Sequence, residues 1–161
     1  MNKEHSYNTV IKWTGNRGTG TSNYKAYERS HTIIVDGKTP ILGSSDTAFR
    51  GDASKYNPEE LLVSSISACH MLWYLHLCSV EGVIVTHYED KAIGTMLESS
   101  DGGGVFTGVV LNPIVRVSKP SMIKSAMELH TKANELCYIA NSLNFEVHHK
   151  AIINSEKEEI D

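Results

Sequence analysis

The chain has 161 residues, enough for one domain with a hydrophobic core and too few for two domains of ordinary size. Apolar residues make up 40% and charged residues 21% of the sequence, which excludes a disordered chain. The net charge of −4 offers no basic surface for a polyanion, so nucleic acid is not an expected partner. We therefore expect a single domain over residues 1–161.

Neither a targeting segment nor a membrane span is expected. The first ten residues are polar and lack the apolar run of a signal peptide. Residues 61–80 are apolar enough to suggest a membrane span, but they contain four serines and two histidines, which favours a buried helix of a soluble protein. Three cysteines in such a chain predict free thiols in a reducing, cytoplasmic environment rather than a disulfide framework.

The first third of the chain is predicted to form strands joined by turns. Strands are expected over residues 7–13, 24–29 and 31–35, with turns at 15–20 and at Asp36-Gly37. Residues 42–56 show no clear period and contain two glycines, so a loop is expected there.

A long helix is predicted over residues 58–80. Asn57 is a favourable N-cap, Pro58 suits the first helical position, and Gly82 is placed to end the helix. Apolar residues occur nearly all the way round, which is typical of a helix buried on most sides. Its centre is expected inside the molecule or at a subunit interface.

The remaining sequence predicts a second helix among further strands. Strands are expected over 83–96 and 105–117, joined by a turn at 101–104. A second helix opens at 119–121, with apolar residues at helical spacing as far as Ile139, and a last strand covers 144–153. Strands grouped ahead of a helix favour an α+β fold with an antiparallel sheet rather than a doubly wound sheet.

Cys69 lies near the middle of the predicted long helix. Because free cysteine is among the most buried residue types, the simplest interpretation is a small core residue. A reactive role needs a cation or dipole that stabilises the thiolate, since only the thiolate attacks. The residues alone leave both interpretations open.

The other two cysteines differ in their access to Cys69. Cys78 lies roughly 180° round the helix and about 13 Å along it, whereas a disulfide needs Cα atoms within about 7 Å. Cys137 belongs to the second predicted helix, and nothing in the sequence prevents its meeting Cys69. These two residues are the one plausible dithiol within a chain.

Glu59 precedes Cys69 by ten residues, which is about 15 Å along a helix axis. It therefore does not reach the thiol of its own helix. One interpretation is a first-turn carboxylate that stabilises the helix start. The others are that Glu59 serves a site from a second subunit, or that the helix start bends back.

Metal chemistry has little support in the sequence. It contains no C-x-x-C and no H-E-x-x-H motif. His130 and Cys137 share a helical face and are the one alternative pair of ligands, although two ligands do not make a site. No metal and no bound cofactor are predicted.

Two segments resemble the OsmC/Ohr family of thiol-dependent hydroperoxide reductases. The first is Asn57-Pro58-Glu59-Glu60-Leu61-Leu62 followed by Ser67-Ala68-Cys69, and the second is Cys137 followed by Ile139-Ala140-Asn141-Ser142-Leu143. The order of strands and helices also fits. The resemblance covers residues 12–152.

The resemblance implies an intertwined homodimer, in which antiparallel sheets wrap two central helices and the sites form at the subunit interface. It further implies that Cys69 attacks an organic hydroperoxide and that Cys137 resolves the resulting sulfenic acid as a disulfide. An external dithiol, often a lipoyl group, would then restore both thiols. The apolar surroundings, Trp73 among them, would favour an organic hydroperoxide over hydrogen peroxide.

The same resemblance implies that Glu59 orients an arginine beside Cys69. A guanidinium stabilises a thiolate while staying charged itself, and a carboxylate holds the guanidinium in plane. Arg50 is favoured as this arginine, with Arg29 and Arg17 as rivals.

One position departs from the family pattern, and one alternative function remains. The family's second cysteine is usually followed by proline, whereas Tyr138 follows Cys137, so the second helix is expected to run on through Cys137. The alternative is a non-catalytic protein of the same fold that binds a small apolar or thiol-reactive molecule. The ionisation of Cys69 distinguishes the two, because a peroxidase needs a thiolate near neutral pH.

Overall fold

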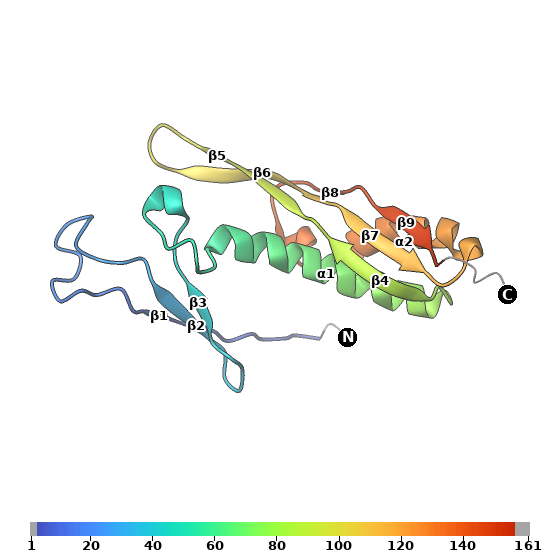
Figure 1. Cartoon of the computed structure of the whole chain (residues 1–161), viewed down its shortest axis with the longest axis horizontal. Coiled ribbons are helices and arrows are strands. Elements are labelled where there is room, and N and C mark those ends of the chain that lie inside the picture. The colour runs from blue at the N-terminus through green and yellow to red at the C-terminus, as the bar shows by residue number, and fades with distance from the viewer. Residues whose placement is uncertain (1–2, 157–161) are drawn as a thin grey trace. The chain divides into compact units, whose positions relative to one another are not determined.

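The structure is a computed structural model of the chain and describes residues 3–156. The chain separates into two compact units, one that ends at Leu61 and one that begins at Leu62, and each is described by itself. In chain order the elements are β1 (Val10–Trp13), β2 (His31–Ile34), β3 (Ile41–Gly43), α1 (Pro58–Val80), β4 (Val85–Asp90), β5 (Ile93–Glu98), β6 (Gly104–Leu111), β7 (Pro113–Val117), α2 (Ile123–Leu136), β8 (Val147–His149) and β9 (Ile152–Ser155) (Figure 1). A single domain over residues 1–161 stays a prediction.

The first unit contains an antiparallel sheet in the order β1-β2-β3. The predicted turn at Asp36-Gly37 is confirmed: Gly37 adopts a φ of 72°, which glycine accepts readily, and the Lys38 N–H donates to the Val35 carbonyl at 3.1 Å. Every residue of β1 is exposed within the single chain, including the apolar Val10 and Ile11.

The strand expected over residues 24–29 is wrong. Tyr27 forms an isolated bridge with Asn16, and the segment otherwise consists of turns and bends. The Arg29 guanidinium folds back and donates to the carbonyl oxygens of Tyr24 and Tyr27, at 2.9 Å and 2.7 Å. These contacts hold the backbone in a turn, and no periodicity in the sequence reports them.

The segment 42–56 is less irregular than expected. It begins inside β3 and contains a short 3-10 helix, Thr47–Phe49. The Asp46 side chain accepts a hydrogen bond from the Ala48 N–H at 2.7 Å and so caps this helix. A loop prediction missed both elements because each is only three residues long.

α1 begins and ends as the sequence predicts. The Glu60 N–H donates to Asn57 Oδ1 at 2.7 Å, and the Asn57 N–H donates to Glu60 Oε2 at 3.1 Å, which is a reciprocal capping box. Gly82, with a φ of 70°, follows the end of the helix. α1 is long and apolar enough to cross a membrane by length and composition alone, a test that the core helix of a soluble protein also passes.

Within the single chain, α1 is buried along one face rather than on most sides. The buried residues recur at every fourth position, namely Ile66, His70, Tyr74 and Cys78. Ser64, Ala68, Leu72 and His76 recur in the same way and form an exposed face. One face of α1 is therefore exposed to solvent within residues 3–156.

Each of the three strands predicted for the second unit is divided into two shorter strands. β6 pairs antiparallel with β5 and parallel with β8, and β7 pairs antiparallel with β4 and parallel with β9. Two three-stranded sheets result, in the orders β4-β7-β9 and β5-β6-β8. At the interruption, the Asn112 N–H donates to the side-chain Oδ1 of Asp90 at 2.7 Å instead of to a backbone carbonyl of a neighbouring strand.

The core of the second unit joins both helices to the sheet β4-β7-β9. Its buried apolar residues come from α1, α2 and β7 and from the turn after α1: Tyr74, Cys78, Val83, Val115, Val117, Ala126 and Ala133. A second cluster lies below the sheet β5-β6-β8 and consists of Ile66, Val109, Leu111 and Val147. The helices are therefore fixed to the sheet along much of their length.

Two histidines, His70 of α1 and His130 of α2, are fully buried in this unit. His70 Nε2 lies 3.0 Å from His130 Nδ1, and the rings are parallel within 3°. Tyr74 stacks on His130 with a centroid separation of 3.9 Å. Burial, together with nearby His149, lowers the pKa of His70 to about 4, and burial with His70 and His149 lowers that of His130 to about 3.

We expect the folded chain to lose stability as the pH falls from 7 to 5. The unfolded chain protonates these histidines near their ordinary pKa of 6.5, whereas the folded chain keeps them neutral. The unfolded state then binds more protons, so the free energy of unfolding falls by on the order of 2 kcal/mol for each histidine by pH 5. Urea unfolding at pH 7, 6 and 5 measures this slope.

His70→Gln should flatten the slope, whereas the matched substitution His148→Gln, on an exposed side chain, should leave it unchanged. A free energy of unfolding that is constant between pH 7 and 5 would contradict the assignment of a neutral buried pair.

Candidate functional site

The structure brings Cys69 and Cys137 together. Cys69 lies in the middle of α1 and is partly exposed, and Cys137 directly follows α2 and is fully buried. The two thiols are close enough that Cys69 contributes to the pKa of Cys137, and both are free. The sequence predicted that the second helix runs on through Cys137, and this prediction is wrong. Cys137 has φ −67° and ψ 108°, which is extended backbone.

Two hydrogen bonds from Asn141, one from its side chain and one from its backbone, hold the end of α2. Asn141 Nδ2 donates to the Glu135 carbonyl at 2.9 Å, and the Asn141 N–H donates to the Cys137 carbonyl at 3.0 Å. The last carbonyls of a helix lack partners within the helix, so these bonds satisfy groups that would otherwise remain unpaired. Asn141 thereby does part of what a proline after Cys137 would do.

The protonation of Cys137 follows from its surroundings. Burial, followed by the hydrogen bond to Cys69, raises the pKa of the Cys137 thiol to about 11. The Ala140 N–H donates to Cys137 Sγ at 3.5 Å and opposes this shift in part. Burial also raises the pKa of Cys78, which belongs to the core around Tyr74. Cys137 and Cys78 are therefore neutral thiols at pH 7, and Cys69 is the most exposed of the three sulfurs.

An aromatic contact crosses between the two cysteine segments. Trp73 lies one helical turn after Cys69, and Tyr138 directly follows Cys137. The rings meet edge to face, with centroids 5.5 Å apart and an interplanar angle of 85°. In the sequence, the one signal that points to Tyr138 as part of this region is its place beside the second cysteine.

The three candidate arginines lie in the first unit in different environments. Arg17 pairs with Glu28, and Arg29 donates to two carbonyls while its Cζ lies 4.2 Å and 4.3 Å from the ring centroids of Tyr24 and Tyr27. Arg50 has no ion pair and no side-chain hydrogen bond within residues 3–156, although its Cζ lies 5.9 Å from the ring centroid of Tyr24. Of the three guanidiniums, it is the one without a hydrogen-bonded or ionic partner among these residues.

Glu59 occupies the first turn of α1, as predicted. Its Oε2 atom is buried and accepts no hydrogen bond in the part of the chain that the structure describes. A buried carboxylate oxygen without a donor is unfavourable, so a donor from outside these contacts is expected.

The alternative metal site at His130 and Cys137 gains no support from the geometry. His130 contacts His70 and Tyr74, and Cys137 contacts Cys69. Over residues 3–156, no three or more His, Cys, Asp or Glu side chains are grouped so that they could hold a metal ion.

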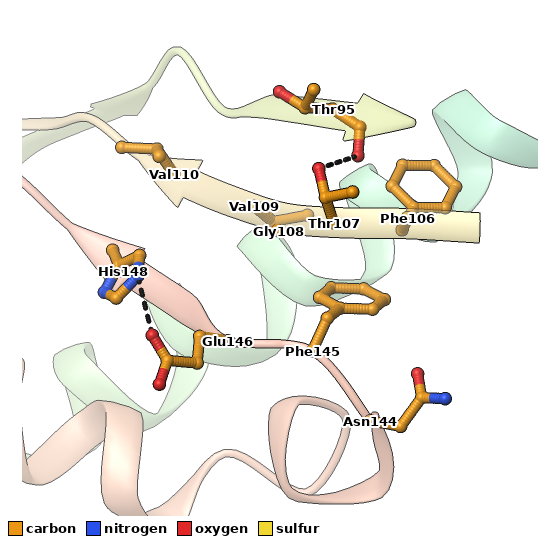
Figure 2. A pocket seen from close by; sticks show the side chains of 10 residues that line it. All are labelled: Thr95, Phe106, Thr107, Gly108, Val109, Val110, Asn144, Phe145, Glu146 and His148. Atoms are coloured by element: carbon orange, nitrogen blue, oxygen red, sulfur yellow. Dashed lines mark hydrogen bonds and ion pairs between the residues drawn. The ribbon is translucent and has the colours of Figure 1, made fainter. Parts of the chain in front are cut away.

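A separate open cavity of about 520 Å³ lies over β5, β6 and β8 (Figure 2). Phe106 and Phe145 stack at one end with centroids 5.7 Å apart, and Glu146 pairs with His148 at 3.1 Å at the other. No cysteine lines this cavity.

Comparisons with known proteins agree with this geometry. A family model described as OsmC-like protein matches residues 51–151. An OsmC-like protein of unknown function from Vibrio cholerae O1 biovar eltor is 30% identical, with a TM-score of 0.83 over 92% of this chain and 100% of that chain. No curated protein matches the sequence.

Two more distant structures share the fold. An organic hydroperoxide resistance protein from Elizabethkingia anophelis is 16% identical, with a TM-score of 0.69 over 96% of this chain and 99% of that chain. The organic hydroperoxide resistance protein of Bacillus subtilis is 20% identical, with a TM-score of 0.62 over 92% of this chain and 98% of that chain.

We expect iodoacetamide to modify Cys69 before Cys78 and Cys137 in the reduced, folded protein. Cys69 is partly exposed, whereas the other two thiols are buried and have raised pKa values. Mass spectrometry of samples quenched at intervals gives the order of labelling. In urea the three cysteines should react at similar rates, and faster labelling of Cys137 than of Cys69 in the folded protein would contradict the environments described above.

Proposed function

The chain belongs to the OsmC-like protein family, and from that membership we propose that it reduces organic hydroperoxides at the paired thiols of Cys69 and Cys137. The contact between these two sulfurs carries the proposal, because a peroxidase that forms an internal disulfide needs two thiols within reach of each other.

The first step is attack of the Cys69 thiolate on the terminal peroxide oxygen. The O–O bond breaks, Cys69 becomes a sulfenic acid, and the alkoxide leaves as an alcohol after taking up a proton. Two electrons pass from sulfur to the peroxide. The partial exposure of Cys69 supports its assignment to this step, because the substrate must reach the sulfur.

The second step is condensation of the Cys137 thiol with the sulfenic acid, which forms a disulfide and releases water. The nearness of the Cys137 thiol to Cys69 supports this step, because the condensing sulfurs must meet. An external dithiol, of the lipoyl kind, then reduces the disulfide by two thiol–disulfide exchanges and restores both cysteines.

We assign the stabilising cation to Arg50 and its orientation to Glu59. Arg17 and Arg29 are engaged by Glu28 and by backbone carbonyls, whereas Arg50 is free of such partners among the described residues. The buried, unpaired Oε2 of Glu59 needs a donor, and a guanidinium satisfies a carboxylate through two parallel hydrogen bonds. Arg50 also adopts a φ of 64° as the left-handed residue that ends the 3-10 helix Thr47–Phe49.

A homodimer is the assembly that we expect. Each unit exposes apolar side chains that favour a protein partner, Val10 and Ile11 of β1 in the first and Leu72 of α1 in the second. The exposed face of α1 also carries Ser64 and Ala68, which suit close packing against a second protein surface better than contact with lipid. We therefore place the protein in the cytoplasm as a homodimer with a role in oxidative-stress defence.

We expect Cys69→Ser to abolish consumption of an organic hydroperoxide such as cumene hydroperoxide, because it removes the attacking sulfur. Cys137→Ser should complete one turnover and stop as the sulfenic acid, which dimedone traps. Cys78→Ala is the matched control and should retain full turnover, since Cys78 lies in the core. Stopped-flow measurement with a dithiol reductant separates these cases.

Hydrogen peroxide is expected to react more slowly than the organic hydroperoxide in the same assay. A wild-type protein that consumes neither peroxide would reject the peroxidase and leave the non-catalytic binding protein. Undiminished turnover in Cys69→Ser would reject the assignment of the nucleophile.

We expect Arg50→Met to slow the peroxide step at pH 7 by about tenfold or more, because loss of an adjacent cation lowers the thiolate fraction. The rate should recover at higher pH, where the thiol ionises without help. Arg116→Met, at an exposed position of β7, is the control. A rate unchanged in Arg50→Met but lost in Arg29→Met or Arg17→Met would transfer the role to that arginine.

A further inference from the structure

α2 ends without a residue that normally ends helices. The seven residues from Cys137 to Leu143 contain no proline and no glycine, and three of them, Ala140–Ser142, form a short 3-10 helix. Nevertheless α2 ends at Leu136, and Cys137 turns out of the helix. Contacts outside the helix must therefore overcome the local preference to continue it.

Some of these contacts are local to the turn. Asn141 donates to the Glu135 carbonyl, and Ser142 Oγ donates to the Tyr138 carbonyl at 2.7 Å. These bonds join the turn to itself and to the last turn of α2. They give the segment its shape, but they do not attach it to α1, where Cys69 lies.

Tyr138 attaches the turn to α1 through its side chain. Its ring packs edge to face on Trp73, which lies about 6 Å along the helix from Cys69 and on nearly the same side. Tyr138 is 71% exposed, so burial of apolar surface explains little of its position. Among the described residues, the aromatic contact that the Tyr138 ring makes is the edge-to-face contact with Trp73.

We propose that Tyr138 is a positioning residue, whose contact with Trp73 holds Cys137 out of the helix and against Cys69. This inference rests on the proposed function only in that the two thiols form a disulfide during turnover. Condensation of the Cys69 sulfenic acid with the Cys137 thiol yields the disulfide and water, and its rate depends on how often the two sulfurs meet.

Equilibrium with mixtures of reduced and oxidised glutathione tests this positioning without any peroxide. The constant for forming the Cys69–Cys137 disulfide measures the effective concentration of one thiol at the other. We expect Tyr138→Ala to lower this constant roughly 2- to 12-fold, the range for losing one edge-to-face aromatic pair. Tyr138→Phe keeps the ring and should match the wild type.

Trp73→Ala removes the same contact from the other side and should lower the constant by a similar factor. The double variant should fall no further than either single variant, because both remove one interaction. Tyr7→Ala, which removes a tyrosine that is 90% exposed, is the matched control and should have no effect.

An unchanged constant in Tyr138→Ala, or an equal fall in Tyr138→Phe, would overturn the inference. Should Tyr138→Ala fail to fold by circular dichroism, Trp73→Leu decides, and an unchanged constant there overturns it as well. Failure of the proposed function looks different, because the wild type would then form the disulfide from glutathione while leaving organic hydroperoxides intact.

Discussion

The position at which α2 ends is the constraint on which the thiol site depends. Were the helix to continue by one more turn, Cys137 would follow the helix axis, and its sulfur would be displaced from Cys69. The chain prevents this with an amide side chain that satisfies one of the last carbonyls and with an aromatic ring that rests on the neighbouring helix. The two thiols are thus brought together by the geometry of a helix terminus rather than by sequence proximity.

The rest of the second unit supplies the rigidity that this arrangement needs. α1 is joined to α2 and β7 by a continuous apolar core, and a pair of neutral histidines fills the space between the helices beyond the thiols. The histidine pair leaves His70 Nδ1 and His130 Nε2 without hydrogen-bond partners, which makes this core costly to protonate. The helices consequently hold their relative positions better near neutral pH than in acid.

Features set by neighbouring residues could be predicted from the sequence, whereas those set across the fold could not. Asn57, Pro58 and Gly82 fix the limits of α1 through local caps, and the family resemblance that they helped to establish is confirmed. The strand over 24–29 failed because Arg29 reaches back to carbonyls of that segment. The end of α2 was missed because Asn141 and Tyr138 act through space.

The interruption at Asn112 was also missed, although Asn112-Pro113 is a dipeptide that marks breaks between strands. The pairing of the two cysteines could be narrowed to Cys69 and Cys137 by helix geometry, and the structure supplied their contact. The assignments of Arg50 and Glu59 remain proposals, because the sequence suggests them through resemblance alone.

Asp90 links that interruption to the reactive helix. One of its oxygens accepts the Asn112 N–H, and the other accepts a hydrogen bond from Ser67, two residues before Cys69. A single carboxylate therefore joins the bend of the sheet to the segment of α1 that carries Cys69. A substitution of Asp90 would remove both bonds at once and leave two polar groups to find other partners, although Asp90 itself is not part of the thiol pair.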